Sequence, residues 1–187
     1  MSRCGHRGAR QPPAMTWLPT DFVHPPRADL PGWLRLRPIS AADAALDHPP
    51  VMGARERLWS VFGEAWGRPA ATIAYEANRA DLERHAAGIE AHESFTYVLF
   101  DATETTEYGC VHIDPPEKAG ADAEVSWRVV DERAGTSPER DVDTFVPRWI
   151  AVAWVPRWIA EAWPFERPRP VGRDLSWKEW PALPDRT

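Results

Sequence analysis

Hydrophobic and polar positions alternate most clearly between Phe95 and Val130, where the pattern predicts three successive strands. The three segments are Phe95–Phe100, Tyr108–Ile113 and Ala123–Val130. The first is a run of aromatic and β-branched residues, typical of a mostly buried strand. In the last, Glu124, Ser126 and Arg128 share one face and apolar residues the other. Polar loops containing proline and glycine separate the segments, so we expect an antiparallel meander.

The chain before this meander predicts one strand and two helices. Trp33–Ile39 alternates and should be a strand, and Ser40 with Asp43 three positions on predicts the N-cap of a short helix. Pro49 and Pro50 are expected to open a longer helix, because a proline costs no hydrogen bond at the first position. That helix should end near Gly67 and Pro69. A second helix is expected over roughly Ile73–His92, with these residues facing inward: Tyr75, Leu82, Ala86 and Ile89.

A turn and a further helix are expected after the meander. Gly135 lies in a turn that follows the third strand, and Ser137 is predicted to cap the helix, with Pro138 at its first position. Further on, Phe165–Val171 alternates weakly between prolines and is expected to form a last, edge strand.

A tandem repeat of nine residues occupies the end of this predicted helix. VPRWIAVAW (Val146–Trp154) is followed at once by VPRWIAEAW (Val155–Trp163). Nine residues at about 100° each turn the apolar stripe by half a turn, so one continuous helix cannot bury both copies on one face. Pro156 would also break a helix that continued through it. We expect the second copy to be the native helix, because it leads directly into Phe165.

Composition limits the classes of function that need to be considered. The chain has 187 residues with 27% charged residues and a net charge of −6, so no basic surface points to nucleic acid. Its two cysteines make no disulfide framework, and no apolar run reaches the roughly 18 residues that a membrane helix needs. We therefore expect a cytoplasmic protein with one domain over 32–171, a loosely attached segment over 1–31 and a tail over 172–187.

A few residues suggest chemistry by their type alone. His85 and His92 lie seven apart on one predicted helix, whereas a close metal pair needs a spacing of four, so no metal site is expected. Cys110 is expected to be a small buried residue rather than a nucleophile, because nothing electropositive flanks it. Glu124, Ser126 and Arg128 are either part of a site or simply the solvent face of their strand.

The order of predicted elements resembles the GNAT acyltransferase fold, specifically a bacterial GNAT-like group. The resemblance covers about Trp33 to Val171, and its matching pieces are GCVHIDPP (Gly109–Pro116), DAEVSWRVV (Asp122–Val130) and WIAEAWPF (Trp158–Phe165). It implies an α+β, GNAT-like domain with a central, mostly antiparallel sheet flanked by helices and truncated after the fifth strand. A partner subunit in a homodimer would then complete the sheet.

The resemblance also implies a binding mode for acetyl-CoA. In that family the strand equivalent to Ala123–Val130 binds the pantetheine arm, so Trp127, Val129 and Val130 would line it. The loop after the strand holds the pyrophosphate at a helix N-terminus. Here the loop would supply these residues: Arg133, Gly135, Thr136 and Ser137. Only Gly135 matches the family's loop pattern outright.

Two functions remain open from the sequence. The first is an acetyl-CoA-dependent N-acyltransferase that acts on a small-molecule or peptide amine, with Glu124 as general base and His112 as a proton relay. The second is a catalytically inactive GNAT-like module that binds a ligand or a protein partner. The loop and the lack of any tyrosine after Tyr108, where the family often has a catalytic one, favour the second function. The matching strand sequences favour the first.

Overall fold

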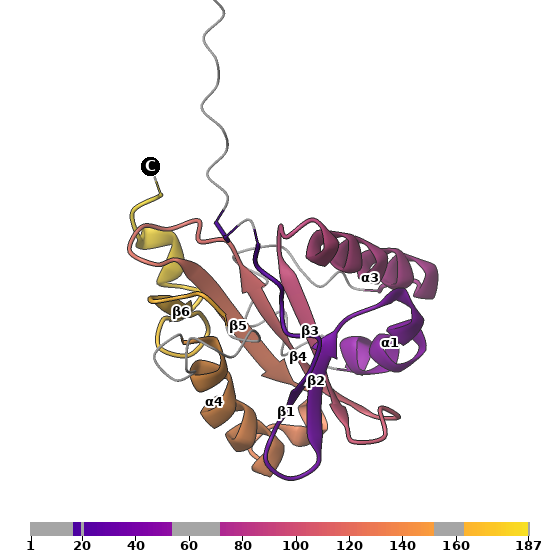
Figure 1. Ribbon diagram of the computed structural model, residues 1–187. Coiled ribbons are helices and arrows are strands. Elements are labelled where there is room, and N and C mark those ends of the chain that lie inside the picture. Colours follow the sequence, from indigo (N-terminus) through magenta and orange to yellow (C-terminus); the bar gives the residue numbers. More distant parts are fainter. Residues whose placement is uncertain (1–16, 20, 54–71, 152–162, 187) are drawn as a thin grey trace, which may run out of the picture.

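The computed structural model describes residues 17–19, 21–53, 72–151 and 163–186, and these form one mixed sheet with helices on both faces (Figure 1). The described strands form a six-stranded sheet in sequence order. They are β1 (Ala28–Asp29), β2 (Leu34–Pro38), β3 (Phe95–Asp101), β4 (Glu107–Asp114), β5 (Ala123–Val129) and β6 (Pro168–Pro170). Neighbouring strands are antiparallel except for β5 and β6, which are parallel. The predicted α+β class, the meander and the edge strand are confirmed.

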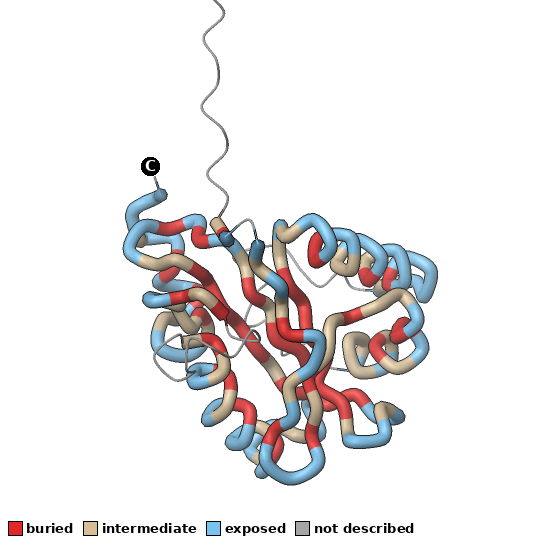
Figure 2. Tube along the Cα trace, viewed as in Figure 1, coloured by how far each residue is buried: buried red, intermediate tan, exposed pale blue. Residues whose placement is uncertain are grey.

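Helices cover the two faces of this sheet unequally. The helices α1 (Ala44–Gly53) and α3 (Tyr75–Glu90) lie against one face, and α4 (Ser137–Ile150) lies against the other (Figure 1). Short 3-10 helices span Ala41–Asp43, Asp131–Arg133 and Trp180–Ala182. Burial follows this layering, because the central strands are buried along most of their length and the helices are buried only on their inner sides (Figure 2).

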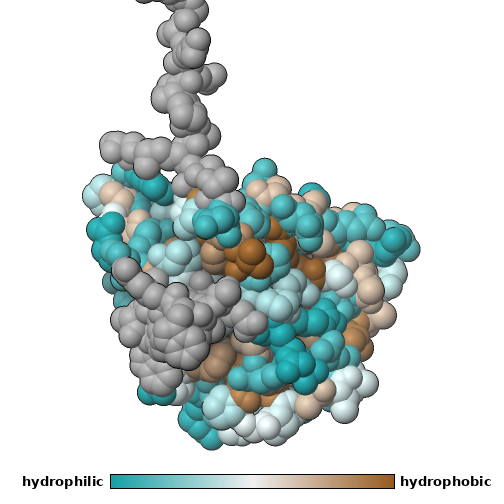
Figure 3. All heavy atoms as spheres, in the orientation of Figure 1, coloured by the Kyte–Doolittle hydropathy of each residue, from teal (hydrophilic) through white to brown (hydrophobic). Residues whose placement is uncertain are grey.

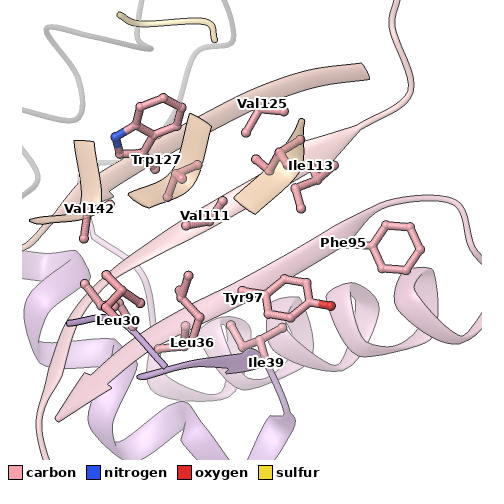
Figure 4. Packing of buried hydrophobic residues seen from close by; sticks show 14 of the residues in the cluster. Leu30, Leu36, Ile39, Phe95, Tyr97, Val111, Ile113, Val125, Trp127 and Val142 are labelled. Atoms are coloured by element: carbon pink, nitrogen blue, oxygen red, sulfur yellow. The ribbon is translucent and has the colours of Figure 1, made fainter. Parts of the chain in front are cut away.

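The main core lies between the sheet and α4. Tyr97, Val111 and Trp127 come from adjacent strands and pack with Val142 of α4 (Figure 4). Leu30 joins them from the N-terminal segment and is 5% exposed. Burying this much apolar surface is the main favourable contribution to folding.

The described part of the N-terminal segment packs on the domain, although the sequence placed 1–31 outside it. The hydroxyl of Tyr97 donates to the carbonyl of Pro25 at 2.7 Å, and the indole N–H of Trp17 donates to the carbonyl of His92 at 2.7 Å. Apolar residues of the segment make the contact, because Leu18 is buried in the core and Phe22 packs against it.

Gly109 creates a bulge that fixes the register of β4. Leu99 pairs with Gly109, but Phe100 pairs with Glu107, so Tyr108 is the extra residue. Gly109 has φ of +150°, and a Cβ placed there would lie 2.0 Å from the carbonyl oxygen of Arg128. Only glycine fits, and the bulge directs both Glu107 and Cys110 toward the face covered by α1 and α3.

Two predictions about the first helices were wrong. Pro49 and Pro50 lie inside α1 rather than at its start, because the helical segment begins earlier. The Ser40 backbone N–H donates to Asp43 Oδ2 at 2.8 Å, and this capping interaction starts the chain turning at Ala41. Tyr75, expected to face inward, is 44% exposed. The predicted end of the longer helix, near Gly67 and Pro69, lies outside the described residues.

Parts of both repeat copies contribute to the core. Val146 and Ile150 of the first copy are buried at the end of α4. Trp163, the last residue of the second copy, is 1% exposed and packs edge-on against Tyr97. Residues 152–162 lie outside the described part, so the expectation that the second copy forms the native helix stays a prediction.

The segment after β6 folds back over the end of the sheet. Val171, Trp177 and Trp180 form a small second cluster. Lys118 lies 4.8 Å from the centre of the Trp180 ring and forms an ion pair with Asp185 at 2.6 Å. The tail therefore covers the loop between β4 and β5.

The surface visible in Figure 3 is mostly hydrophilic, with hydrophobic residues in small groups. The large apolar residues most exposed among those described are Val23, Trp33 and Tyr75. Among the described helices, none combines the length and apolarity needed to cross a bilayer.

Candidate functional site

A cavity of about 920 Å³ lies between the sheet and the helices α1 and α3. Its volume is in the range of small-molecule sites. Asp47 of α1 and His85 of α3 line it from above, and alternate residues of β4 and β5 form its floor. At one end it reaches Val171 and Trp177, beside the point where β6 leaves β5.

Three cross-strand pairs make up the floor of the cavity. Cys110 lies opposite Arg128, His112 opposite Ser126, and Asp114 opposite Glu124. Directly paired residues share one face of a sheet, and successive pairs on that face are about 7 Å apart. The floor therefore carries a cationic end, a histidine in the middle and an acidic end.

This arrangement contradicts the interpretation of the even-numbered residues of β5 as a solvent face. Glu124 is 8% exposed and Ser126 is 9% exposed. Both faces of β5 are covered, one by α4 and the other by the cavity and the C-terminal segment. Alternation along one strand cannot distinguish a solvent face from the polar wall of a cavity.

A chain of hydrogen-bonding groups crosses the middle of the cavity. The Thr96 hydroxyl lies 3.1 Å from His112 Nδ1 and 3.1 Å from His85 Nδ1. On the other side, His112 Nε2 lies 3.3 Å from the sulfur of Cys110. His85 Nε2 is 3.9 Å from Asp81 on the outer side of α3, where His85 is one-third exposed. The chain thus links the cavity floor to solvent.

Both histidines are predominantly neutral at pH 7. Burial lowers the pKa of His112 and that of His85, and it outweighs the opposing effect of nearby carboxylates such as Asp114 for His112 and Asp81 for His85. A neutral imidazole has one free acceptor nitrogen, which is what a general base requires. Cys110 is buried as expected, and burial raises the pKa of its thiol, so it is protonated.

Glu124, the predicted general base, is held by three donors. Its Oε1 accepts from Arg169 Nη1 at 3.2 Å and from the backbone N–H of Lys118 at 3.3 Å. Its Oε2 accepts from the indole N–H of Trp180 at 3.0 Å. Both oxygens of the Glu124 carboxylate are therefore already engaged by donors from other parts of the chain.

Asp114 and Glu117 are carboxylates at this end that have no arginine partner among the described residues. Burial raises the pKa of the Asp114 carboxyl, and the negative charges of Glu124 and Glu117 raise it further. The acidic end therefore combines one ion-paired carboxylate, Glu124, with two that form no ion pair with an arginine, Asp114 and Glu117.

The strands β5 and β6 pair only over a short stretch. Ala123, Glu124 and Val125 pair with Pro168–Pro170, and the Val171 N–H then donates to the carbonyl of Val125 at 2.8 Å. Peptide groups of alternate residues point to the same edge of a strand, so those of Trp127 also point toward the edge that β6 leaves. The Trp127 side chain points to the other face, where its indole N–H donates to Asp143 Oδ1 at 2.7 Å.

The hydrogen-bonding groups of the loop after β5 are largely engaged in contacts within the loop and with α4. The Gly135 N–H donates to Glu139 Oε2 at 2.7 Å, and Gly135 has φ of +72°. Arg133 lies over the Tyr108 ring at 4.7 Å instead of pointing along the loop. Thr136, not Ser137, is the N-cap of α4, and its N–H donates back to the carbonyl of Arg133.

Comparison with known proteins gives structural matches only. No protein-family model matches the sequence, and no curated protein shows significant similarity to it. A solved structure described as a "probable acetyltransferase" superposes with a TM-score of 0.51 at 11% identity, over 66% of this chain and 65% of that chain. The chain has the GNAT fold.

Other solved structures with the GNAT fold are also similar, at lower TM-scores. The ribosomal-protein-S5-alanine acetyltransferase from Vibrio fischeri matches with a TM-score of 0.49 and 17% identity, over 65% of each chain. The microcin C7 self-immunity acetyltransferase MccE, solved with acetyl-CoA and AMP, has a TM-score of 0.48 and 13% identity, over 61% of this chain and 60% of that chain. The match thus spans less than two thirds of the length of these proteins.

Only part of the predicted cofactor set suits acetyl-CoA in this GNAT fold. The edge at Trp127, with Val129 and Val130 buried beside it, suits an extended pantetheine arm. The loop suits the pyrophosphate poorly, because a carboxylate already accepts the Gly135 N–H. Asp131 and Glu132 add negative charge to the same loop.

Sequence reasoning brought Glu124 and His112 into one cavity but missed Thr96 and His85. Thr96 is the cross-strand partner of His112, which the polar position within an apolar run could have indicated. His85 was weighed only as a metal ligand. Its role as a neighbour of Thr96 depends on how α3 packs on the sheet, which no local pattern encodes.

Proposed function

We propose that this protein transfers an acyl group from acetyl-CoA to a primary amine of a small molecule or peptide. The observation that carries the proposal is the meeting of two features at one place. The cavity, which suits an acceptor, reaches Val171 and Trp177 at the point where β6 separates from β5. An amine in the cavity and a thioester at the strand edge would therefore be adjacent.

Acetyl-CoA, when bound, supplies the activated acyl group as a thioester. The peptide groups of Trp127 would hold the pantetheine arm in the manner of an added strand, and Val129 and Val130 would contact its apolar parts. The loop would contribute less to cofactor binding, because the Gly135 N–H already donates to Glu139 and Arg133 lies over Tyr108. The loop residues concerned are Arg133, Gly135, Thr136 and Ser137. We therefore expect weak binding of the cofactor.

His112 is our candidate for the group that takes the proton from the attacking amine. It lies opposite Ser126, the first floor residue of β5 beyond the stretch that pairs with β6. With Nδ1 protonated and donating to Thr96, its Nε2 is the acceptor nitrogen. This Nε2 lies 3.3 Å from the Cys110 sulfur, so the amine would have to replace that contact. The Nδ1 proton can then pass to Thr96 Oγ1, and the Thr96 hydroxyl proton to His85 Nδ1. Each transfer leaves every group with its normal valence.

Glu124 has a different role in this proposal. Through Arg169, Trp180 and Lys118 it joins β5 to β6, the C-terminal segment and the β4–β5 loop. We infer that it positions the end of the cavity and that it does not exchange protons during the reaction.

The proposal is tested by titrating the protein with acetyl-CoA in a calorimeter and by assaying acetyl transfer to a panel of amines. We expect a binding heat at millimolar cofactor and amide formation that depends on His112. Desulfo-CoA and free CoA serve as controls for the thioester. If acetyl-CoA gives no heat and no thermal shift at millimolar concentration, the proposal is wrong.

The contact between Gly135 and Glu139 favours a second candidate, a GNAT-like module that binds a ligand without catalysis. A loop whose N–H group is already bound to an internal carboxylate has less capacity for a phosphate. The two candidates differ in one outcome. The module would bind amines or other ligands in the cavity, yet no amide would form with any amine.

A further inference from the structure

Arg128 is a cation in the cavity whose side chain contacts the thiol of Cys110 and pairs with no described carboxylate. It lies on the same face as Cys110 and lines the cavity. Its Nη1 is inaccessible to solvent and has no hydrogen-bond partner among the described residues. No described carboxylate forms an ion pair with it, in contrast to Arg169, which pairs with Glu124 on the same floor.

Three acids, Glu107, Asp47 and Asp131, lie near Arg128, and none of them forms an ion pair with it. Both carboxyl oxygens of Glu107 are buried without partners, and burial raises the pKa of this carboxyl to about 9, so it is uncharged at pH 7. The carboxylate of Asp47 accepts from the side-chain amide of Asn78 at 2.9 Å, and it attracts Arg128 without forming an ion pair with it. The other group beside Arg128 is the thiol of Cys110, which burial keeps protonated.

A cation held in such a place normally has an anion beside it. Removing a charge from water is costly unless an opposite charge and hydrogen bonds replace the lost hydration. The guanidinium is planar and matches a carboxylate through two parallel hydrogen bonds. A single positive charge with Asp47 nearby suits a monoanion better than a phosphate dianion.

The opposite end of the cavity favours a positive charge. Asp114, Glu117 and Glu124 line that end, and only Glu124 is paired with an arginine among the described residues. Between the two ends lies His112, about 7 Å along the strand from the Arg128 pair. A ligand that spans from Arg128 to His112 would therefore carry an anionic group at one end and an amine at the other.

We propose that the acceptor is an amino carboxylate, whose carboxylate binds Arg128 and whose amine lies beside His112 and Asp114. This inference rests on the proposed acyl transfer and narrows its acceptor from any amine to this class. Arg128 is then a residue that determines specificity and takes no part in proton transfer.

Matched acceptors that differ only in a carboxylate test the inference. Suitable pairs are lysine and cadaverine, ornithine and putrescine, and γ-aminobutyrate and 1-aminopropane. We expect the wild-type protein to acetylate at least one carboxylated member about tenfold or more better in kcat/KM than its partner, as a charge-assisted contact implies. Arg128→Gln should reduce that ratio to about one, while Arg79→Gln, on the exposed side of α3, should leave it unchanged.

Binding measured without turnover separates this inference from the proposed function. Titration of lysine and of cadaverine, followed by NMR shifts of wild-type and Arg128→Gln protein, remains informative even if no amide forms. Tighter binding of lysine that Arg128→Gln abolishes supports the inference. Equal binding of the two ligands overturns it. A second outcome also overturns the inference. In it, the effects of Arg128→Gln and Glu107→Gln on the free energy of unfolding are strongly coupled, and neither substitution changes the preference for lysine over cadaverine. Glu107 would then be the ion-pair partner of Arg128.

Discussion

The backbone N–H of Gly135 donates to the carboxylate of Glu139 at 2.7 Å, across the first turn of α4. An anion is favoured at this position, because the N-terminus of a helix carries a partial positive charge and free N–H groups. The protein supplies that anion from its own side chain. A pyrophosphate in the same place would have to displace Glu139 and would meet the negative charges of Asp131 and Glu132.

Glu139→Ala should therefore tighten acetyl-CoA binding. Removing one negative charge within a few ångströms of the phosphates is worth about 1 kcal/mol near the surface, which corresponds to roughly a fivefold lower Kd. Isothermal calorimetry measures the change, with Asp141→Ala on the exposed side of the same helix as control. An unchanged or weaker affinity in Glu139→Ala would show that the pyrophosphate binds elsewhere.

The chain from His112 through Thr96 to His85 predicts a specific pH dependence. Because the pKa of His112 is lowered in the folded protein, the imidazole is a competent base at neutral pH. We expect kcat to fall as the pH is lowered through this reduced pKa, and His112→Gln to lower kcat by about 100-fold and to remove that limb of the profile.

Thr96→Val tests the relay separately from the base. The substitution keeps the shape of the side chain but removes the hydroxyl that lies between the two imidazoles. We expect kcat to fall about tenfold and to recover when a small buffer such as imidazole is added. Thr144→Val, on the exposed face of α4, is the matched control. A loss of activity that no buffer restores would indicate a purely structural role for Thr96.

Glu107 predicts an unusual dependence of stability on pH. Its carboxyl titrates near pH 9 when folded, against 4.5 for the ordinary group. The unfolded chain therefore releases this proton from about pH 4.5 upward while the folded chain retains it, and the resulting loss of stability grows up to about pH 9. Glu107→Gln should remove this penalty and raise the free energy of unfolding at pH 7 by at most about 3 kcal/mol.

Denaturant unfolding of wild-type and Glu107→Gln protein at pH 4.5 and pH 7 measures this effect. The two proteins should be nearly equal in stability at the lower pH and differ at the higher one. A destabilised Glu107→Gln at pH 7 would mean that the carboxylate is ionised and paired with Arg128.

Glu124→Gln distinguishes a structural role from a catalytic one. The substitution leaves Arg169 without its anion in a site where both side chains are largely buried. We expect a loss of about 1–3 kcal/mol in stability and a kcat within about threefold of wild type when measured well below the melting temperature. Glu132→Gln, in the exposed loop, is the control. A kcat reduced by 100-fold or more in a stable Glu124→Gln protein would restore Glu124 as the general base.

The sequence predicted the meander because its strands carry strong local signals. Alternation and β-branched residues place Phe95, Val111 and Val125 in strands, and the structure pairs them in the expected antiparallel order. The prediction that a helix starts at Pro49 was wrong, because α1 already begins at Ala44. The capping interaction of Ser40 and Asp43 starts the helical turn earlier and outweighs the preference of proline for a first position.

The candidate site was harder to predict because it depends on contacts between distant parts of the chain. His112 and Glu124 were placed in the site by their positions on neighbouring strands together with the resemblance to the GNAT fold. Whether Glu124 can act as a base depends on Trp180, 56 residues away, and on Arg169, which reach it only after the C-terminal segment folds back. The same holds for His85, whose neighbour Thr96 is set by helix packing.

The most direct test of the account is the formation of an amide from acetyl-CoA and an amine, followed by mass spectrometry of the product. The wild-type protein should acetylate at least one amine of the panel, and His112→Gln should reduce the rate about 100-fold while binding acetyl-CoA as tightly as wild type. Formation of no amide with any amine, or an unchanged rate in His112→Gln, would contradict it.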